Sequence, residues 1–236
     1  TVVLGLGLAT LLAEKGATAL TVADVPGISV AGLLIDAGPQ MSRVLMEAGP
    51  RGSKRNHAAD PTVLSDLFFR VGGAAVGNAE TCLEINSHHV IGDHLWIWRA
   101  DHGDRESGRV HVGWDESVGE QGLVVNGDDV TCYGLFVEHF RRWQTVWNGE
   151  RGRTYFYQNE LPYDPPSQSG WRRDSDRGWA AYKVADHVKE HHAIGMGVYA
   201  NFTADPRIIL ASAVEVPQTP GVRIENVTTI GLHIQP

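Results

Sequence analysis

The chain has 236 residues, which is enough for one large domain or two small ones around a sizeable core. Its net charge of −8 argues against a nucleic-acid-binding protein, and it contains no uninterrupted apolar run long enough for a membrane span. Seven Trp, six Tyr and 27 Gly favour a β-rich protein with many turns and a saccharide-like ligand.

The first segment, TVVLGLGLATLL, is apolar but has no Met, no basic start and no AxA cleavage site, so it is not read as a signal peptide. It is expected to belong to the middle of a longer chain. Gly5, Gly7 and the later Asp24 resemble a dinucleotide-binding start. However, Thr10 occupies the third glycine position, and no alternating strand–helix series follows, so these glycines are expected in turns between strands.

The strongest pattern is a repeat shared by segments 20–38, 83–103 and 123–140. Each copy has an apolar triplet, a short polar residue, an apolar residue four places later and a second apolar strand five places after that. The matched positions are Val22, Ile85 and Val125; Asp24, Asn86 and Asn126; Ile28, Val90 and Val130; and Leu33, Leu95 and Leu135. Weaker copies occupy 182–202 and 214–234.

These short strands, separated by Gly, Asn and Asp turns, predict an all-β fold, a right-handed parallel β-helix with coils of about 22 residues. Residues 1–236 would form a single domain, and 103–121 and 162–180 would be loops at one edge. A helical period is nearly absent, with Pro61–Phe69 the best candidate for a short helix. A β-sandwich of similar short strands is the alternative fold.

Several other kinds of chemistry have little support. Cys82 and Cys132 are better read as two buried thiols than as a disulfide, and no zinc-type cysteine spacing is present. None of the eleven histidines lies in a motif such as HExxH, so no metal site is predicted. There is no GxSxG motif for a nucleophilic serine, and no cofactor is implied.

Two glutamates are the leading catalytic candidates. Glu138 lies in FVEHF and Glu160 in YFYQNELPY, 22 residues apart, which is close to one coil of a parallel β-helix. Two carboxylates stacked on one wall are what sugar hydrolysis needs, and burial among aromatic side chains would raise one pKa toward that of a general acid. Their polar neighbours are His139, Gln158, Asn159, Tyr163 and Asp164. The alternative is two solvated glutamates on an exposed sheet.

The motif WIWRADHG supplies a second group of candidates. Strand alternation places Trp96 and Trp98 on one face, with Asp101 and His102 just after the strand. An aromatic platform beside a carboxylate can hold a sugar, because its C–H groups stack on the ring and its hydroxyls bond to the acid. The alternative for each Trp is a side chain that seals the edge of the core.

The motifs WIWRADHG, GLVVNGDDVTCYGLFVEHF, VWNGERGRTYFYQNELPYDPP and VEVPQTPGVRI resemble the C-terminal β-helix of the family 55 glycoside hydrolases, in the pectate-lyase-like superfamily. These are two-β-helix laminarinases that act as exo-β-1,3-glucanases. The likeness runs from about Gly5 to Gln235 and is densest over 83–166. The likeness does not include the family's N-terminal β-helix, so the chain is expected to be a fragment or the C-terminal half of a larger two-β-helix protein, and Asp104–Val110 looks like an insertion beside the pocket.

The resemblance implies an inverting mechanism with Glu160 as general acid and Glu138 placing or activating the attacking water. It also implies a pocket for the terminal sugar shaped by Trp98, Asp101 and Tyr163. Together with the motifs themselves, it predicts a substrate-binding set, which is Trp98, Asp101, His102, His139, Gln158 and Tyr163. The expected ligand is a β-glucan polysaccharide or oligosaccharide, and the expected location is extracellular.

Two other functions stay open. One is a catalytically silent β-helix that binds glycan or builds a surface assembly. The other is a polysaccharide lyase, which would recruit a basic residue such as Lys183, Arg141 or Arg142 and act on an acidic polymer. The negative charge of the chain fits a neutral glycan better.

Overall fold

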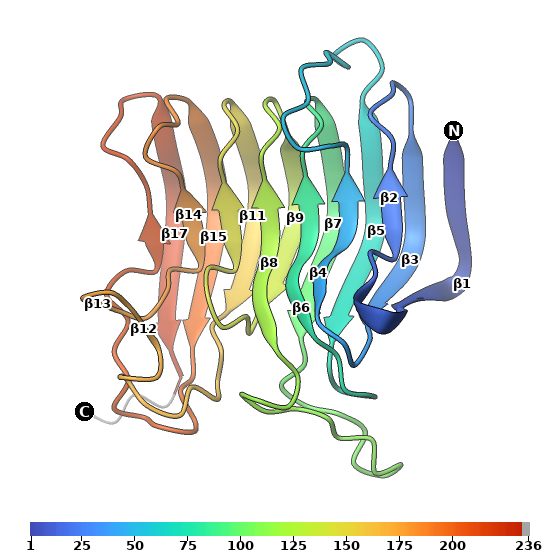
Figure 1. Ribbon diagram of the computed structural model, residues 1–236. Helices are drawn as coiled ribbons and strands as arrows, with labels where there is room; N and C mark the ends of the chain where they lie inside the picture. Colours follow the sequence, from blue (N-terminus) through green and yellow to red (C-terminus); the bar gives the residue numbers. More distant parts are fainter. Residues whose placement is uncertain (233–236) are drawn as a thin grey trace.

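The protein is a parallel β-helix (Figure 1), seen in a computed structural model that describes residues 1–232. The long sheet has the order β1, β3, β5, β7, β9, β11, β15, β17, and every neighbouring pair is parallel. Its strands are β1 (Val2–Ala13), β3 (Ser29–Ala37), β5 (Thr62–Val71), β7 (Val90–Arg99), β9 (Thr131–Glu138), β11 (Gly152–Glu160), β15 (His191–Ala200) and β17 (Val222–Gly231).

A second, shorter parallel sheet faces the first, and each coil contributes one strand to each sheet. Its strands are β2 (Leu20–Val22), β4 (Ser42–Ala48), β6 (Ala79–Ile85), β8 (Gly119–Val125), β10 (Thr145–Trp147), β14 (Tyr182–Val184) and β16 (Val214–Glu215). The remaining elements are the 3-10 turn η1 (Glu14–Gly16) and an antiparallel hairpin of β12 (Arg172–Arg173) and β13 (Asp176–Arg177). No helix in the described part of the chain is long and apolar enough to cross a membrane.

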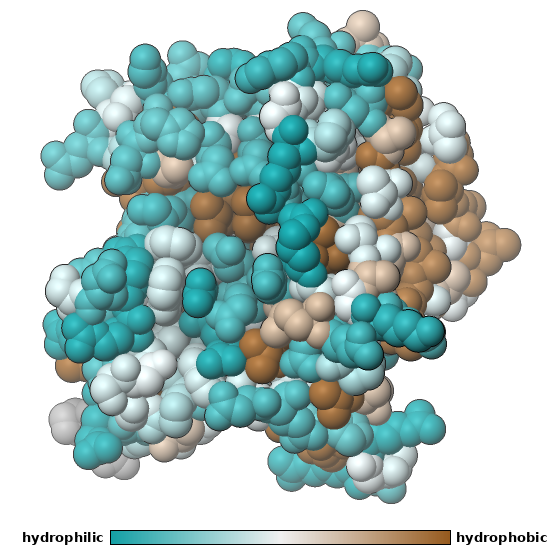
Figure 2. Space-filling model, viewed as in Figure 1, coloured by the Kyte–Doolittle hydropathy of each residue, from teal (hydrophilic) through white to brown (hydrophobic). Residues whose placement is uncertain are grey.

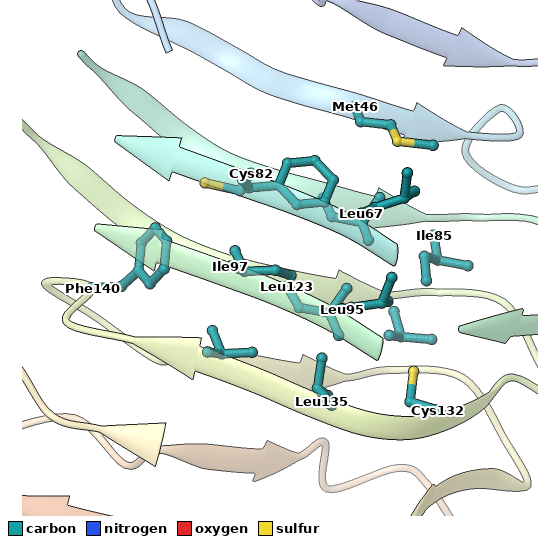
Figure 3. Packing of buried hydrophobic residues seen from close by; sticks show 14 of the residues in the cluster. Met46, Leu67, Cys82, Ile85, Leu95, Ile97, Leu123, Cys132, Leu135 and Phe140 are labelled. Atoms are coloured by element: carbon teal, nitrogen blue, oxygen red, sulfur yellow. The ribbon is translucent and has the colours of Figure 1, made fainter. Parts of the chain in front are cut away.

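The repeat found in the sequence corresponds to the register of these sheets. Leu33, Leu95 and Leu135 stand in one inward-facing column, with Leu67 between the first two. Figure 3 shows the later members of this column packed against Ile85 and Leu123 of the short sheet. Burial of matched apolar side chains coil after coil therefore sets both the register and the core.

Two coils of the β-helix are not among the copies of the repeat recognised in the sequence. Val22, Ile85 and Val125 do share a column of the short sheet, but that column also contains Ala48 and Trp147. Those coils carry an apolar residue of different size at the matched place. The last residues of the weak copy over 214–234 lie outside the described residues.

In β1 two successive residues, Gly7 and Leu8, have positive φ, and each later strand of the long sheet bends at one such residue. These residues, here called the corner column, fall between paired positions of the register. They are Gly32, Asp66, His94, Gly134, Phe156, Gly195 and Asn226, with φ between +48° and +75°. After the bend, the alternation of inward- and outward-facing side chains is shifted by one residue. The bend therefore divides the long sheet into two parts that face different directions.

The corner explains why the helix predicted over Pro61–Phe69 is wrong. This segment lies almost entirely in β5, whose left-handed residue is Asp66. The bend shifts the alternation by one place, so that Leu64 and Leu67 are both buried at a spacing of three. A spacing of three followed by two imitates the apolar pattern of a helix.

Polar side chains secure the turns between the sheets. Asn126 donates to the side chain of Asn86 at 2.7 Å, and Asn148 donates to that of Asn126 at 2.8 Å. The predicted edge loops are present between β7 and β8 and between β11 and β14, and the first extends beyond the coils in Figure 1. Cys82 and Cys132 are buried free thiols.

Candidate active site

The two candidate glutamates lie at the carboxyl ends of adjacent strands of the long sheet. Glu138 pairs with Trp98 of the preceding coil, and the backbone N–H of His139 donates to the carbonyl of Glu160 at 2.8 Å. Trp98, Glu138 and Glu160 therefore occupy one outward-facing column over three coils. The neighbouring column contains Trp96, Phe136 and Gln158.

Glu138 and the neighbouring column border an open groove of about 350 Å³, lined by His94, Trp96, Phe136, Glu138 and Gln158. The groove is mostly aromatic, with one carboxylate and one amide on its wall. This is the composition expected of a site that stacks a sugar ring and fixes it with a few polar contacts.

Glu138 is only 8% exposed. Its burial raises the pKa of the carboxyl above its ordinary value, and the negative charges of Glu160 and Asp101 act in the same direction. Trp96 opposes this shift by donating its indole Nε1–H to Glu138 Oε2 at 2.7 Å, and Gln158 also opposes it. The carboxyl therefore holds its proton to higher pH than an exposed glutamate does.

Glu160 is more open, with 30% of its side chain exposed. The phenol of Tyr163 donates to Glu160 Oε2, and the Gln158 amide approaches Oε1 at 3.4 Å. Burial, followed by this contact with Glu160, raises the pKa of Tyr163, so the phenol remains a donor. Glu138 thus accepts a hydrogen bond from Trp96 of the preceding coil, whereas Glu160 accepts one from Tyr163, which follows its own strand. The two carboxyl groups are therefore positioned by different segments of the chain.

His139 connects the two coils from below the groove. Its Nδ1 bonds to the carbonyl of Leu161 at 3.1 Å, and burial lowers its pKa, so the ring is neutral with Nδ1–H as the donor. The unprotonated Nε2 then faces Asp101 Oδ1 at 3.6 Å and Glu160 Oε2 at 3.9 Å. These separations exceed a direct hydrogen bond and suit one water molecule shared by the three groups.

The WIWRADHG motif lies beside the groove, to which it contributes Trp96. The rings of Trp96 and Trp98 stack with centroids 5.7 Å apart, and His102 lies 5.0 Å from Trp98. His102 Nδ1 and Asp101 Oδ1 are 2.8 Å apart. The structure thus brings all eight predicted site residues into one cluster: Glu138, Glu160, Trp98, Asp101, His102, His139, Gln158 and Tyr163.

Arg99 belongs to this site and had no role assigned from the sequence. It is 1% exposed and forms a two-pronged ion pair with Asp164, at 3.0 and 2.8 Å. It also donates to the carbonyls of Gly113, Ser117 and His139. The sequence did contain a signal for this residue. The strand alternation that places the Trp98 side chain on the outer face places that of Arg99 in the core, where a buried charge needs hydrogen-bonding or oppositely charged partners.

The basic residues considered for a lyase are occupied elsewhere. Lys183 pairs with Glu215 at 3.2 Å, and Arg142 pairs with Glu120 at 3.0 Å. Arg141 stacks over Trp114 at 4.7 Å. None of these three residues lines the groove beside Glu138.

Comparison with known proteins agrees with this architecture. An exo-beta-1,3-glucanase from Streptomyces sp. (strain SirexAA-E / ActE) is 47% identical over 232 residues, which is 98% of this chain and 37% of the relative. Two structures of sacteLam55A from Streptomyces sp. SirexAA-E, one of a variant in complex with glucose, superpose with TM-scores of 0.91 and 0.92. They are 47% and 48% identical to this chain, and each match covers 95% of it and 40% of sacteLam55A.

The chain thus spans about 37% of the length of the curated relative that it matches. The model of the LAM55 pectate lyase-like domain matches residues 1–160, which include β1 through β11 and both candidate glutamates. The chain belongs to the LAM55 pectate lyase-like domain family.

Proposed function

We propose that this protein hydrolyses β-1,3-glucan from the chain end with inversion of the anomeric carbon. The observation that carries this proposal is the pair Glu138 and Glu160, stacked in adjacent coils beside an aromatic groove. Glycoside hydrolysis uses two such carboxyl groups, one to protonate the leaving oxygen and one to act on water. The similarity to an exo-beta-1,3-glucanase supports β-1,3-glucan as the substrate.

The two carboxyl groups have different roles in this proposal. Glu160, the more open one, protonates the glycosidic oxygen of the leaving chain. Glu138 removes a proton from the attacking water as that water adds to the anomeric carbon. An inverting site needs carboxyl groups about 6.5–9.5 Å apart, which is wider than the roughly 4.8 Å between stacked strands. The separate anchoring of the two groups by Trp96 and Tyr163 supports the wider arrangement.

The remaining polar groups would hold the terminal sugar. We assign Asp101, His102 and Tyr163 to its hydroxyl groups and Trp98 to its ring face. We assign Gln158, which lines the groove beside Glu138, to the hydroxyl groups of the same sugar.

We further propose that the rest of a longer protein completes the cleft. Strand β1 is an end strand of the long sheet, paired only with β3. Figure 2 shows the hydrophobic side chains gathered along this edge, and they include the exposed Val2, Leu4, Leu6, Leu8 and Leu12. An N-terminal β-helix of the same protein would cover this surface. Because the substrate is a polymer, we place the activity outside the cell.

Proton NMR of laminarin during hydrolysis tests the reaction class. We expect the first glucose released to be the α-anomer, because inversion at a β-linkage gives that product. Initial release of the β-anomer would exclude inversion. Saccharide binding with no released sugar, from laminarin or other β-glucans, would instead favour the silent glycan-binding β-helix.

The raised pKa of Glu138 predicts the acidic limb of the pH–rate profile. Glu138 must be ionised to act on water, so activity should rise with pH only as the solution passes this raised pKa. Trp96→Phe removes a hydrogen bond that favours the ionised form, so the pKa should increase further. We expect the acidic limb of kcat/KM on laminarin to move to higher pH. Trp98→Phe is the control, because no hydrogen bond joins that indole to Glu138 in the described residues. If the acidic limb of the pH–rate profile does not move in Trp96→Phe, Glu138 is not the group whose ionisation sets that limb.

A further inference from the structure

Phe156 occupies a backbone position that a bulky side chain rarely adopts. It is the corner-column residue of β11, with φ +66°. Bulky side chains are rare outliers at positive φ, whereas Gly, Asn, Asp and His are tolerated there. The other corner positions from Gly32 to Asn226 are filled by those four tolerated types, and the one other bulky apolar residue at such a bend among the described residues is Leu8 in the end strand β1.

The phenyl ring is also exposed rather than buried. Phe156 is 57% exposed, more than Tyr133 or Trp96. On the adjacent coils the corner residues are Gly134 and Gly195, and a Cβ added to Gly195 would meet nothing within 4 Å. The ring therefore projects from the corner with open space on the side of the following coil. A strained and exposed aromatic residue calls for a functional explanation.

Its position relative to the groove indicates what that function is. The Phe156 ring lies 5.8 Å from that of Phe136, which lines the groove together with Glu138 and Gln158. Along β11 the outward-facing residues run from Phe156 through Gln158 to Glu160, roughly 13 Å at the rise of an extended strand. Phe156 thus stands at the end of the groove opposite the strand exits that carry Asp101 and Tyr163.

We propose that Phe156, backed by Phe136, is a binding platform for the part of the glucan chain beyond the bond that is cleaved. This inference rests on the proposed function for its direction: with the terminal sugar held by Asp101 and Tyr163, the leaving chain must pass Glu160 toward the corner. An exposed aromatic face binds the C–H face of a sugar ring, and Phe offers that face without a competing charge. The platform distinguishes a polymer from a free monosaccharide.

The test is the binding of laminarin and of glucose, measured by calorimetry in the Glu160→Gln background so that no hydrolysis interferes. Phe156→Asn places at the corner the residue type that Asn226 already supplies two coils away. We expect this change to weaken laminarin binding about 3- to 10-fold while glucose affinity changes much less. The melting temperature should stay level or rise, because Asn tolerates positive φ.

Asn226→Phe is the matched control, since it puts the same ring at the same kind of corner away from the groove. It should lower the melting temperature without altering laminarin affinity. Unchanged laminarin affinity in Phe156→Asn would overturn the platform, as would an equal loss for glucose and laminarin or a marked fall in melting temperature. Absence of hydrolysis by the parent protein would reject the proposed reaction, while a selective loss of laminarin binding would still establish the platform.

Discussion

Glu160→Gln is expected to lower kcat on laminarin by roughly 10²- to 10⁴-fold, the usual contribution of a general acid. Gln is nearly isosteric with Glu and can still accept the bond from Tyr163, so binding should be largely retained. Steady-state rates and laminarin binding, measured on the same preparation, separate the two effects. A variant that hydrolyses laminarin as fast as the parent would remove Glu160 from the mechanism.

A change of leaving group sharpens this expectation. An aryl β-glucoside with an acidic phenol departs without protonation, so Glu160→Gln should recover most of its loss on that substrate. Glu138→Gln should not recover, because water must still be activated whatever group leaves. The opposite pattern would exchange the roles of the two glutamates, which differ in burial.

Much of this site could be predicted because a β-helix converts sequence spacing into spatial columns. The 22-residue interval between Glu138 and Glu160 is one coil, so a separation along the chain became a neighbour relation in the sheet. Strand alternation likewise placed Trp96 and Trp98 together on the outer face. Both inferences needed only the local geometry of extended strands.

The remainder depended on contacts between segments with no fixed spacing. The sequence could not show which carboxyl pKa is raised; it is that of Glu138, whose burial depends on how Trp96 and the neighbouring coils pack. The corner column was missed because its Gly, Asp, His and Asn residues lie inside apolar strands, where they were not recognised as left-handed positions that alter the alternation. For the same reason Pro61–Phe69 was mistaken for a helix, and Phe156 did not stand out.

Arg99→Met is expected to reduce the free energy of unfolding by about 3 kcal/mol, the lower end for breaking a buried ion pair. The substitution keeps most of the side-chain volume but leaves Asp164 without its partner. It also removes the donors to the carbonyls of Gly113, Ser117 and His139. The effect should be at the lower end because Asp164 is 31% exposed and water can solvate it again. Urea denaturation at neutral pH measures the change.

Arg142→Met is the matched control. The Arg142 side chain is 56% exposed and pairs with Glu120 at 3.0 Å, so the loss should stay below about 1 kcal/mol. The double change Arg99→Met with Asp164→Asn should cost less than the sum of the two single changes, because the asparagine removes the uncompensated charge. Additive losses would mean that the carbonyl contacts of Arg99, and not its ion pair, carry the stability. Activity should fall along with stability in Arg99→Met alone, since the same guanidinium fixes His139 and the segment that presents Tyr163 to Glu160.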